Sequence, residues 1–347
     1  MSPIFNHLLI PYIVAMVLAV TMGGSGTAPA FSAAFGANVI RKSIIPGIFG
    51  IMVFLGAIIA GKGTATTLGK GLIDPSILSF PVVSIILFSV AVSLLIANLA
   101  GIPQSTSQST VLAVTAPALY FHQLNNHKLL VEIIPTWFIL PVISFIIALL
   151  LGKYIYKPMR RRGLTMPRAQ NENLKPLYNG ILVAMSLYVA FSIGSNNVAN
   201  AAGPIATMTA NELNISVDQN FIIIMILSTL IVAPCFGIGS SIFGHKILKN
   251  TGKEIVLFGK FEAVIIAFIS ASLLLFASIS KGVPTSLVQL NVAAILGIGV
   301  AKLGPRHIFK KTEVKKFFAM WIIAPTIAFL LCIAMIWLGD KYALLGL

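Results

Sequence analysis

The sequence predicts an all-α polytopic membrane protein built from two inverted-topology repeats of about five crossings each, and three observations support this. Hydrophobic residues make up 57% of the 347 residues, charged residues only 10%, and the mean hydropathy is +0.97. Soluble chains average about 25% charged residues. The apolar residues gather into runs of about 20, the length of a membrane-spanning helix. Two motifs also recur, in the same order, in both halves of the chain.

The apolar runs form two sets of five, separated by a polar stretch. They lie at 8–40, 43–61, 78–100, 103–120 and 129–152, and at 178–210, 219–243, 255–280, 283–302 and 318–339. The stretch between the sets is rich in Lys and Arg and contains one acid, Glu172. We therefore expect a first transmembrane repeat at 1–152, a basic linker at 153–177 and a second, inverted repeat at 178–347.

The two motifs support the repeat. Residues 23–30 (GGSGTAPA) take the same place in the first set as residues 194–201 (GSNNVANA) take in the second. Residues 101–108 (GIPQSTSQ) similarly correspond to residues 282–289 (GVPTSLVQ). Two motif pairs in the same order predict an internal duplication.

Loop charges predict the orientation of the repeats. Five is an odd number of crossings, so equivalent loops of the two halves should face opposite sides of the membrane. The basic pair Arg41-Lys42 corresponds to the acids Glu212 and Asp218, and the strongly basic loop 302–316 corresponds to the weakly charged loop 121–128. Because basic loops stay inside, we expect both termini outside, a cytoplasmic linker, and a location in the cell inner (plasma) membrane.

The motifs also put polar groups at membrane depth, where an unpaired group is costly. Segments 8–40 and 178–210 are too long for one straight crossing, and their central Gly and Pro predict discontinuous helices. Pro103 and Pro284 stand where half-helices would begin at the midplane, followed by Ser and Thr. Four helix N-termini would then converge on one anion. Close packing through small residues and ordinary helix capping are the alternatives.

The candidate substrate-binding residues come from both motif pairs. They are Ser25, Gly26, Thr27, Ser105, Thr106, Ser107, Asn196, Asn197, Asn200, Thr285 and Ser286. Inverted repeats with a midplane site are typical of secondary transporters. The sequence has no Ser-His-Asp set, zinc spacing or Walker motif, so we expect neither an enzyme nor a cofactor or metal. The basic loops are expected to contact the lipid bilayer and not nucleic acid; the oligomeric state, a homodimer included, stays open.

These motifs resemble those of the inorganic phosphate transporter family, which includes phosphate:cation symporters and a branch of bacterial sulfate permeases. Residues 194–201 are similar to the family signature G-A-N-D-V-A-N-A, and residues 103–108 and 284–289 to its P-x-S-x-T-H loop. The resemblance covers essentially the whole chain and implies two inverted repeats.

The departures from the family pattern indicate the substrate. Asn197 in one copy and Gly26 in the other stand where the family has Asp. A carboxylate can accept the O–H of H2PO4⁻, whereas sulfate carries no proton and is better served by neutral donors. The resemblance, including residues 299–305, is closest to the sulfate-permease branch. We expect a secondary active transporter that imports sulfate, or a similar oxyanion such as thiosulfate; the alternatives are a phosphate:cation symporter and an anion channel or passive facilitator.

Energetics requires a coupling ion. Moving a dianion inward against an inside-negative potential costs about 4.6 kcal/mol per 100 mV, so at least two cations must accompany it. The family implies Na⁺ or H⁺, and the missing Asp residues favour H⁺. The candidate coupling-ion residues are Glu262, which could instead form an ion pair with a nearby Lys, and Gln108 and Gln289, which stand where the family has His.

Overall fold

The computed structural model describes residues 3–99, 104–161, 175–250 and 259–346, and their regular secondary structure is helical apart from an isolated bridge between Ile73 and Leu124. Within these residues seven helices are long and apolar enough to cross a membrane, or eight if one bent pair counts as a span. The chain is therefore an all-α multi-pass membrane protein, as predicted. Residues 101–103 of the second motif and residues 162–174 of the linker lie outside the described ranges.

The helices follow the two halves of the sequence. The first half contains α1 (Pro3–Gly36), α2 (Ile45–Ala60), α3 (Lys62–Thr66), η1 (Thr67–Gly71), η2 (Pro75–Ile77), α4 (Phe80–Leu99), α5 (Thr106–Tyr120), η3 (Lys128–Ile133), α6 (Ile134–Leu151), η4 (Gly152–Tyr156) and α7 (Lys157–Arg161). The second half contains α8 (Lys175–Asn197), α9 (Ala199–Glu212), α10 (Val217–Asn250), α11 (Lys260–Phe276), η6 (Ala277–Lys281), α12 (Leu287–Leu303), α13 (Pro305–Phe309) and α14 (Thr312–Lys341). The bent pair is α2 with α3 and η1, which meet at 72°.

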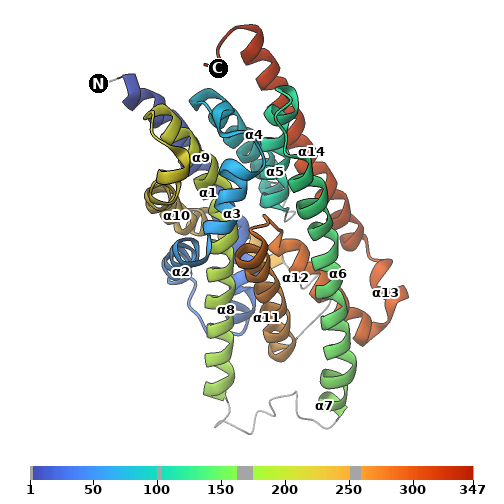
Figure 1. Ribbon diagram of the computed structural model, residues 1–347. Coiled ribbons are helices and arrows are strands. Elements are labelled where there is room, and N and C mark those ends of the chain that lie inside the picture. Colours follow the sequence, from blue (N-terminus) through green and yellow to red (C-terminus); the bar gives the residue numbers. More distant parts are fainter. Residues whose placement is uncertain (1–2, 100–103, 162–174, 251–258, 347) are drawn as a thin grey trace.

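Helix pairs that pack in one half have counterparts in the other. α1 packs along α10 as α8 packs along α2, α6 packs against α12 as α14 packs against α5, and α1 contacts α4 as α8 contacts α11. Both termini lie at one end of the molecule, and α7 and the start of α8 lie at the opposite end (Figure 1). The helix pairs thus match between the two halves, as expected of a duplication. The inverted orientation of the repeats and their separation by a linker at 153–177 stay predictions.

The helices α4 and α5 form a hairpin: α4 is long and apolar enough to cross a membrane, as segment 78–100 predicts, whereas α5 has only 15 residues. Ser79, which precedes α4, donates to the carbonyl of Leu345 at 2.6 Å, and Tyr120, at the end of α5, donates to Asp340 at 2.8 Å. The hairpin therefore starts and ends beside the C-terminal end of α14.

The helices α11 and α12 form an equivalent hairpin from the linker end, where segments 255–280 and 283–302 predict two crossings. Lys302, near the end of α12, donates to Glu262, near the start of α11, at 2.9 Å. The two arms of each hairpin differ in length. α5 and α12 have 15 and 17 residues, fewer than the roughly 20 that a crossing needs, whereas Phe80–Leu99 and Lys260–Lys281 have 20 and 22.

The first long segment, α1, is one continuous helix, so the prediction that it is discontinuous is wrong. Its glycines serve close helix packing, the alternative reading: a Cβ on Gly23 would lie 2.2 Å from the carbonyl oxygen of Phe236 in α10. Small residues at such crossings let two backbones approach. In the second copy only Val198 separates α8 from α9.

We predict that Gly23→Ala lowers the thermal stability of the protein in detergent, because the added methyl must displace α10; overpacking of this kind costs about 1–3 kcal/mol. The matched control is Gly180→Ala in α8, where nothing lies within 4 Å of the new Cβ and where Ala favours the helix. Equal melting temperatures for the two variants would contradict this account of the α1–α10 contact.

Candidate anion-binding site

The tips of the two hairpins meet inside the molecule through a pair of glutamines. Gln108 Nε2 donates to Gln289 Oε1 at 3.1 Å, and Gln289 Nε2 donates to Gln108 Oε1 at 2.8 Å. Both side chains are buried. Gln108 and Gln289, two of the three coupling-ion candidates, thus bind each other and hold the N-terminal turn of α5 against that of α12.

Each of these helices begins with a serine cap. Ser105 Oγ accepts from the backbone N–H of Gln108, and Ser286 Oγ accepts from that of Gln289, both at 3.2 Å. A cap of this kind satisfies one of the free amides at a helix start. The two amides directly after each cap have no acceptor within the helix, so each hairpin tip presents backbone donors and the positive end of a helix dipole.

A small cavity lies at these two helix starts. It is lined by Ser25, Gly26, Pro29, Gln104, Thr106, Ser107, Ile193, Asn197, Thr285, Ser286, Leu287 and Val288. These described lining residues carry no charge, and they include the first two residues of both α5 and α12. Converging helix N-termini with neutral polar side chains form a site suited to an anion.

Most of the predicted substrate residues line this cavity. Those that do are Ser25, Gly26, Thr106, Ser107, Asn197, Thr285 and Ser286. Thr27, Ser105, Asn196 and Asn200 are not among the lining residues. Two helix N-termini meet at the cavity and not the predicted four, because α1 continues through its motif and α8 is interrupted only at Val198.

Asn196 ties the hairpin tips to α8. Its Oδ1 accepts from the backbone N–H of Thr285 at 3.1 Å and from Ser107 Oγ at 3.0 Å. Its Nδ2 donates to Ser278 Oγ at 2.8 Å and to the carbonyl of Val283 at 3.3 Å. Asn196 is fully buried, so its amide holds the framework of the site together.

Asn200 and Thr27 also belong to this framework. Asn200 Nδ2 donates to Ser107 Oγ at 3.3 Å. Thr27 donates back along α1 to the carbonyl of Gly23 at 2.7 Å. In a membrane such bonds satisfy polar groups that lipid cannot, although Asn200 Oδ1 has no hydrogen-bond partner among the described residues.

Sequence reasoning missed several lining residues, and Gln104 is the most polar of them. Gln104 stands directly before the capping serine of α5 and is 1% exposed. Its polar side chain at membrane depth, inside the motif 101–108, could have marked Gln104 as a candidate. Pro29, Ile193, Leu287 and Val288 also line the cavity, and as neighbours of the motif residues they give no chemical signal of their own.

Glu262 lies apart from the cavity lining. Its Oε1 accepts from Lys302 at 2.9 Å and its Oε2 from the backbone N–H of Gly259 at 2.8 Å. This is the ion pair that the sequence left as the alternative, with Lys302 in place of Lys260, which donates to Asn179 instead.

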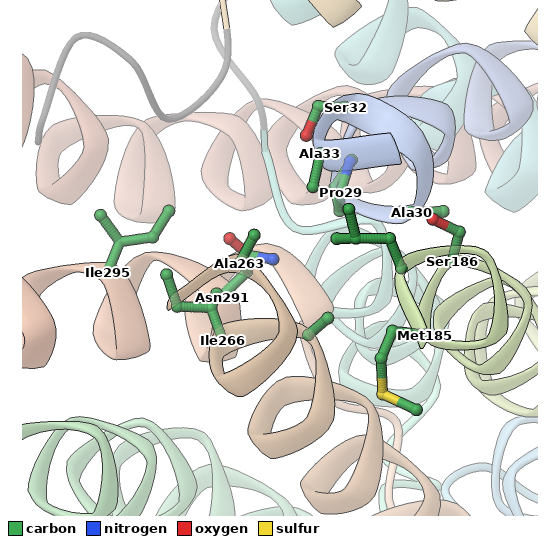
Figure 2. Close-up of a pocket in the computed structure, with 12 residues that line it drawn as sticks. Pro29, Ala30, Ser32, Ala33, Met185, Ser186, Ala263, Ile266, Asn291 and Ile295 are labelled. Atoms are coloured by element: carbon green, nitrogen blue, oxygen red, sulfur yellow. The ribbon is translucent and has the colours of Figure 1, made fainter. Parts of the chain in front are cut away.

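A second pocket adjoins the cavity and shares Pro29 with it. Figure 2 shows Ser32 and Ala33 of α1 at one side of this pocket, Met185 and Ser186 of α8 below them, and Asn291 of α12 facing Pro29. The pocket is lined by the N-terminal half of α8 and by the first turns of α11, so it lies on the linker side of the cavity.

The end of the molecule where the termini lie is packed closely around α9. Thr207 donates to the carbonyl of Gly69 at 2.7 Å, and Asn211 donates to the carbonyl of Pro75 at 2.7 Å. A Cβ on Gly203 would lie 2.7 Å from the carbonyl oxygen of Ala65. These contacts join α9 to α3, η1 and η2. The side of the cavity toward the termini is therefore closely packed, whereas the side toward the linker has the adjoining pocket.

The model of the phosphate transporter family matches residues 22–332 of the chain. The chain belongs to this family. A sulfate permease of Bacillus subtilis, CysP, is 30% identical over 312 residues, which are 90% of this chain and 82% of that protein. The family's proteins are transporters, so this member is a transporter and not an enzyme.

Two further proteins resemble the chain over nearly its whole length. A putative phosphate permease of Pyrococcus horikoshii, PH0640, is 25% identical over 94% of this chain and 96% of its own length. The solved structure titled "The sodium-dependent phosphate transporter" matches with a TM-score of 0.80 at 22% identity, covering 97% of this chain and 99% of that one. The fold of this family member is thus that of a known transporter structure.

We predict that Asn196→Leu and Asn197→Leu have different effects on stability. Asn196→Leu leaves several buried partners unpaired, each costing about 1–3 kcal/mol, so its melting temperature in detergent should fall steeply. Asn197 lines the cavity, and its side chain forms no hydrogen bond to the described residues, so Asn197→Leu should melt close to the parent. A reversed order would contradict the framework role of Asn196.

Proposed function

We propose that this transporter imports sulfate, or a similar tetrahedral oxyanion such as thiosulfate, by cation-coupled symport with alternating access. The observation that carries the proposal is the neutral cavity at the starts of α5 and α12. Sulfate carries no proton near neutral pH, so it needs only hydrogen-bond donors, and backbone amides, hydroxyls and carboxamides supply them. The relative named as a sulfate permease supports this choice.

Asn197 is the residue on which the choice of sulfate over phosphate depends. It lines the cavity at the position where the family signature has an acid. A carboxylate there would attract the proton of a hydrogen phosphate and repel a sulfate dianion, whereas an amide repels neither. Phosphate is the second candidate, because the relative from Pyrococcus horikoshii is named as a putative phosphate permease.

The absence of charge among the described lining residues suits a transport cycle. An arginine or lysine in a buried site holds an oxyanion through strong charge-assisted hydrogen bonds. Neutral dipoles bind a dianion well enough to select it and weakly enough to release it. Moderate affinity suits a carrier because each transport cycle ends with release of the substrate.

We propose H⁺ as the coupling ion and Na⁺ as the alternative. The signature acids are missing at Gly26 and Asn197, and the described residues hold no cluster of three or more His, Cys, Asp and Glu that could hold a metal ion. At least two cations must enter with each dianion to cancel the cost of the membrane potential. We further propose the plasma membrane as the location, with both termini outside and the linker cytoplasmic.

Uptake by proteoliposomes tests this proposal. Labelled sulfate should accumulate under an inward H⁺ gradient imposed without Na⁺, and an inward Na⁺ gradient at constant pH serves as the comparison. A channel would only equilibrate sulfate with the membrane potential. Competition by unlabelled phosphate as strong as that by sulfate would contradict the sulfate assignment, and accumulation under the Na⁺ gradient alone would contradict H⁺ coupling.

We predict that Asn197→Asp lowers sulfate uptake by about tenfold or more, because a carboxylate in the cavity repels the dianion and tenfold corresponds to only about 1.4 kcal/mol. Asn197→Ser, which keeps a neutral hydrogen-bonding group, is the matched control and should retain more uptake. The measurement is the initial rate of labelled sulfate uptake at equal protein content. Unchanged uptake in Asn197→Asp would show that Asn197 does not face the substrate.

A further inference from the structure

Gln104 is a buried carboxamide that the fold itself does not use. Its side chain is 1% exposed, and neither Nε2 nor Oε1 has a hydrogen-bond partner among the described residues. It lines the cavity directly before the capping Ser105 of α5. Gln104 therefore stands at a helix start, at the one place in the molecule where the two hairpin tips meet.

An unpartnered buried amide costs free energy, since it gives up its bonds to water without replacing them. The other glutamines of the tips show how the fold avoids this cost: Gln108 and Gln289 bond reciprocally through both amide atoms. Gln104 has no such partner. A buried polar group without a partner needs an explanation. Because Gln104 lines the cavity, the explanation we favour is a bound ligand that supplies the missing hydrogen-bond partner.

The two tips are not equivalent around the cavity. Thr285 occupies the position in the second tip that Gln104 occupies in the first, and the backbone N–H of Thr285 already donates to Asn196. Thr285 can offer a hydroxyl, whereas Gln104 offers two N–H donors on a longer side chain. The first tip thus contributes a donor that the second tip lacks.

We propose that Gln104 is a substrate-binding residue that donates from Nε2 to the bound tetrahedral oxyanion. The inference rests on the proposed function, because it takes the cavity as the substrate site. Its amide is neutral, so it adds donors without a fixed charge, in keeping with the other lining residues. Together with the free backbone amides of α5 and α12, Gln104 lets the cavity replace the hydration of a dianion.

The test is the Gln104→Met variant, which keeps the length of the side chain and removes both amide atoms. Thermal unfolding of the purified protein in detergent is followed without anion and across a sulfate titration. Without anion the variant should be at least as stable as the parent, because it loses an unpaired buried amide and no hydrogen bond. Its sulfate affinity should fall by about tenfold to a hundredfold, as expected for loss of a hydrogen bond to a charged group.

The matched control is Ser109→Ala, one turn further along α5. Ser109 is fully buried and its Oγ also lacks a partner, but it does not line the cavity. Ser109→Ala should therefore keep the sulfate affinity of the parent. A Gln104→Met variant that binds sulfate as tightly as Ser109→Ala would overturn the proposal.

Gln104→Glu provides a second measurement that does not depend on Gln104→Met folding. Burial raises the pKa of a Glu carboxyl at this position, so sulfate affinity is followed from pH 9 downward. The ionised carboxylate repels sulfate, so the affinity should be low at pH 9 and recover as the pH falls and the carboxyl is protonated, while the parent shows no such recovery. Sulfate affinity equal to that of the parent over the whole range would overturn the proposal.

The same titration with phosphate separates this inference from the proposed function. Stabilisation of the parent by phosphate alone, lost in Gln104→Met, would support the role of Gln104 and contradict the sulfate assignment. If Gln104→Met is stabilised by sulfate or phosphate as strongly as the parent is, the role of Gln104 is overturned. A parent stabilised by neither anion would overturn both.

Discussion

Inside a bilayer every polar group needs a partner within the protein, and this requirement governs the centre of the molecule. Two hairpins enter from opposite ends and stop where α5 meets α12. The reciprocal bonds between Gln108 and Gln289 join them, and Asn196 forms three hydrogen bonds to the second hairpin and one to Ser107 of the first. Gln104 is the residue of the tips whose side-chain amide is left without a partner at both atoms among the described residues, and Asn200 lacks one at Oδ1.

The surroundings of the cavity differ between the two ends. Toward the linker, an adjoining pocket lies between α1, α8, α11 and α12 (Figure 2). Toward the termini, Thr207 and Asn211 hold α9 against η1 and η2, and glycines such as Gly203 bring the backbones into contact. The proposed alternating access would require the two ends to exchange open and closed packing, and the helix pairs that match between the two halves are consistent with such an exchange.

The cavity proposed to bind the anion offers helix dipoles and neutral hydrogen-bond donors. Asn197 and Gln104 are the two carboxamides that line the cavity. Charged residues lie elsewhere among the described residues: Glu262 and Lys302 pair at the linker end, and Lys70 and Asp218 pair near the end where the termini lie. These two ion pairs thus lie away from the cavity lining, which is uncharged among the described residues.

The sequence by itself determined the class of protein, the duplication and the motifs of the site, because apolar run lengths and polar residues at membrane depth are local properties of the chain. Tertiary structure alone decided how those motifs are used. Gly23 looked like part of a helix break, yet it packs against α10 inside a continuous helix, since its contact lies more than 200 residues away. Asn196 and Asn197 are neighbours with the same side chain, but helix geometry points one into the framework and the other into the cavity. Gln104 became recognisable only when its lack of a partner could be seen, because satisfaction of a polar group depends on residues that only the fold brings together.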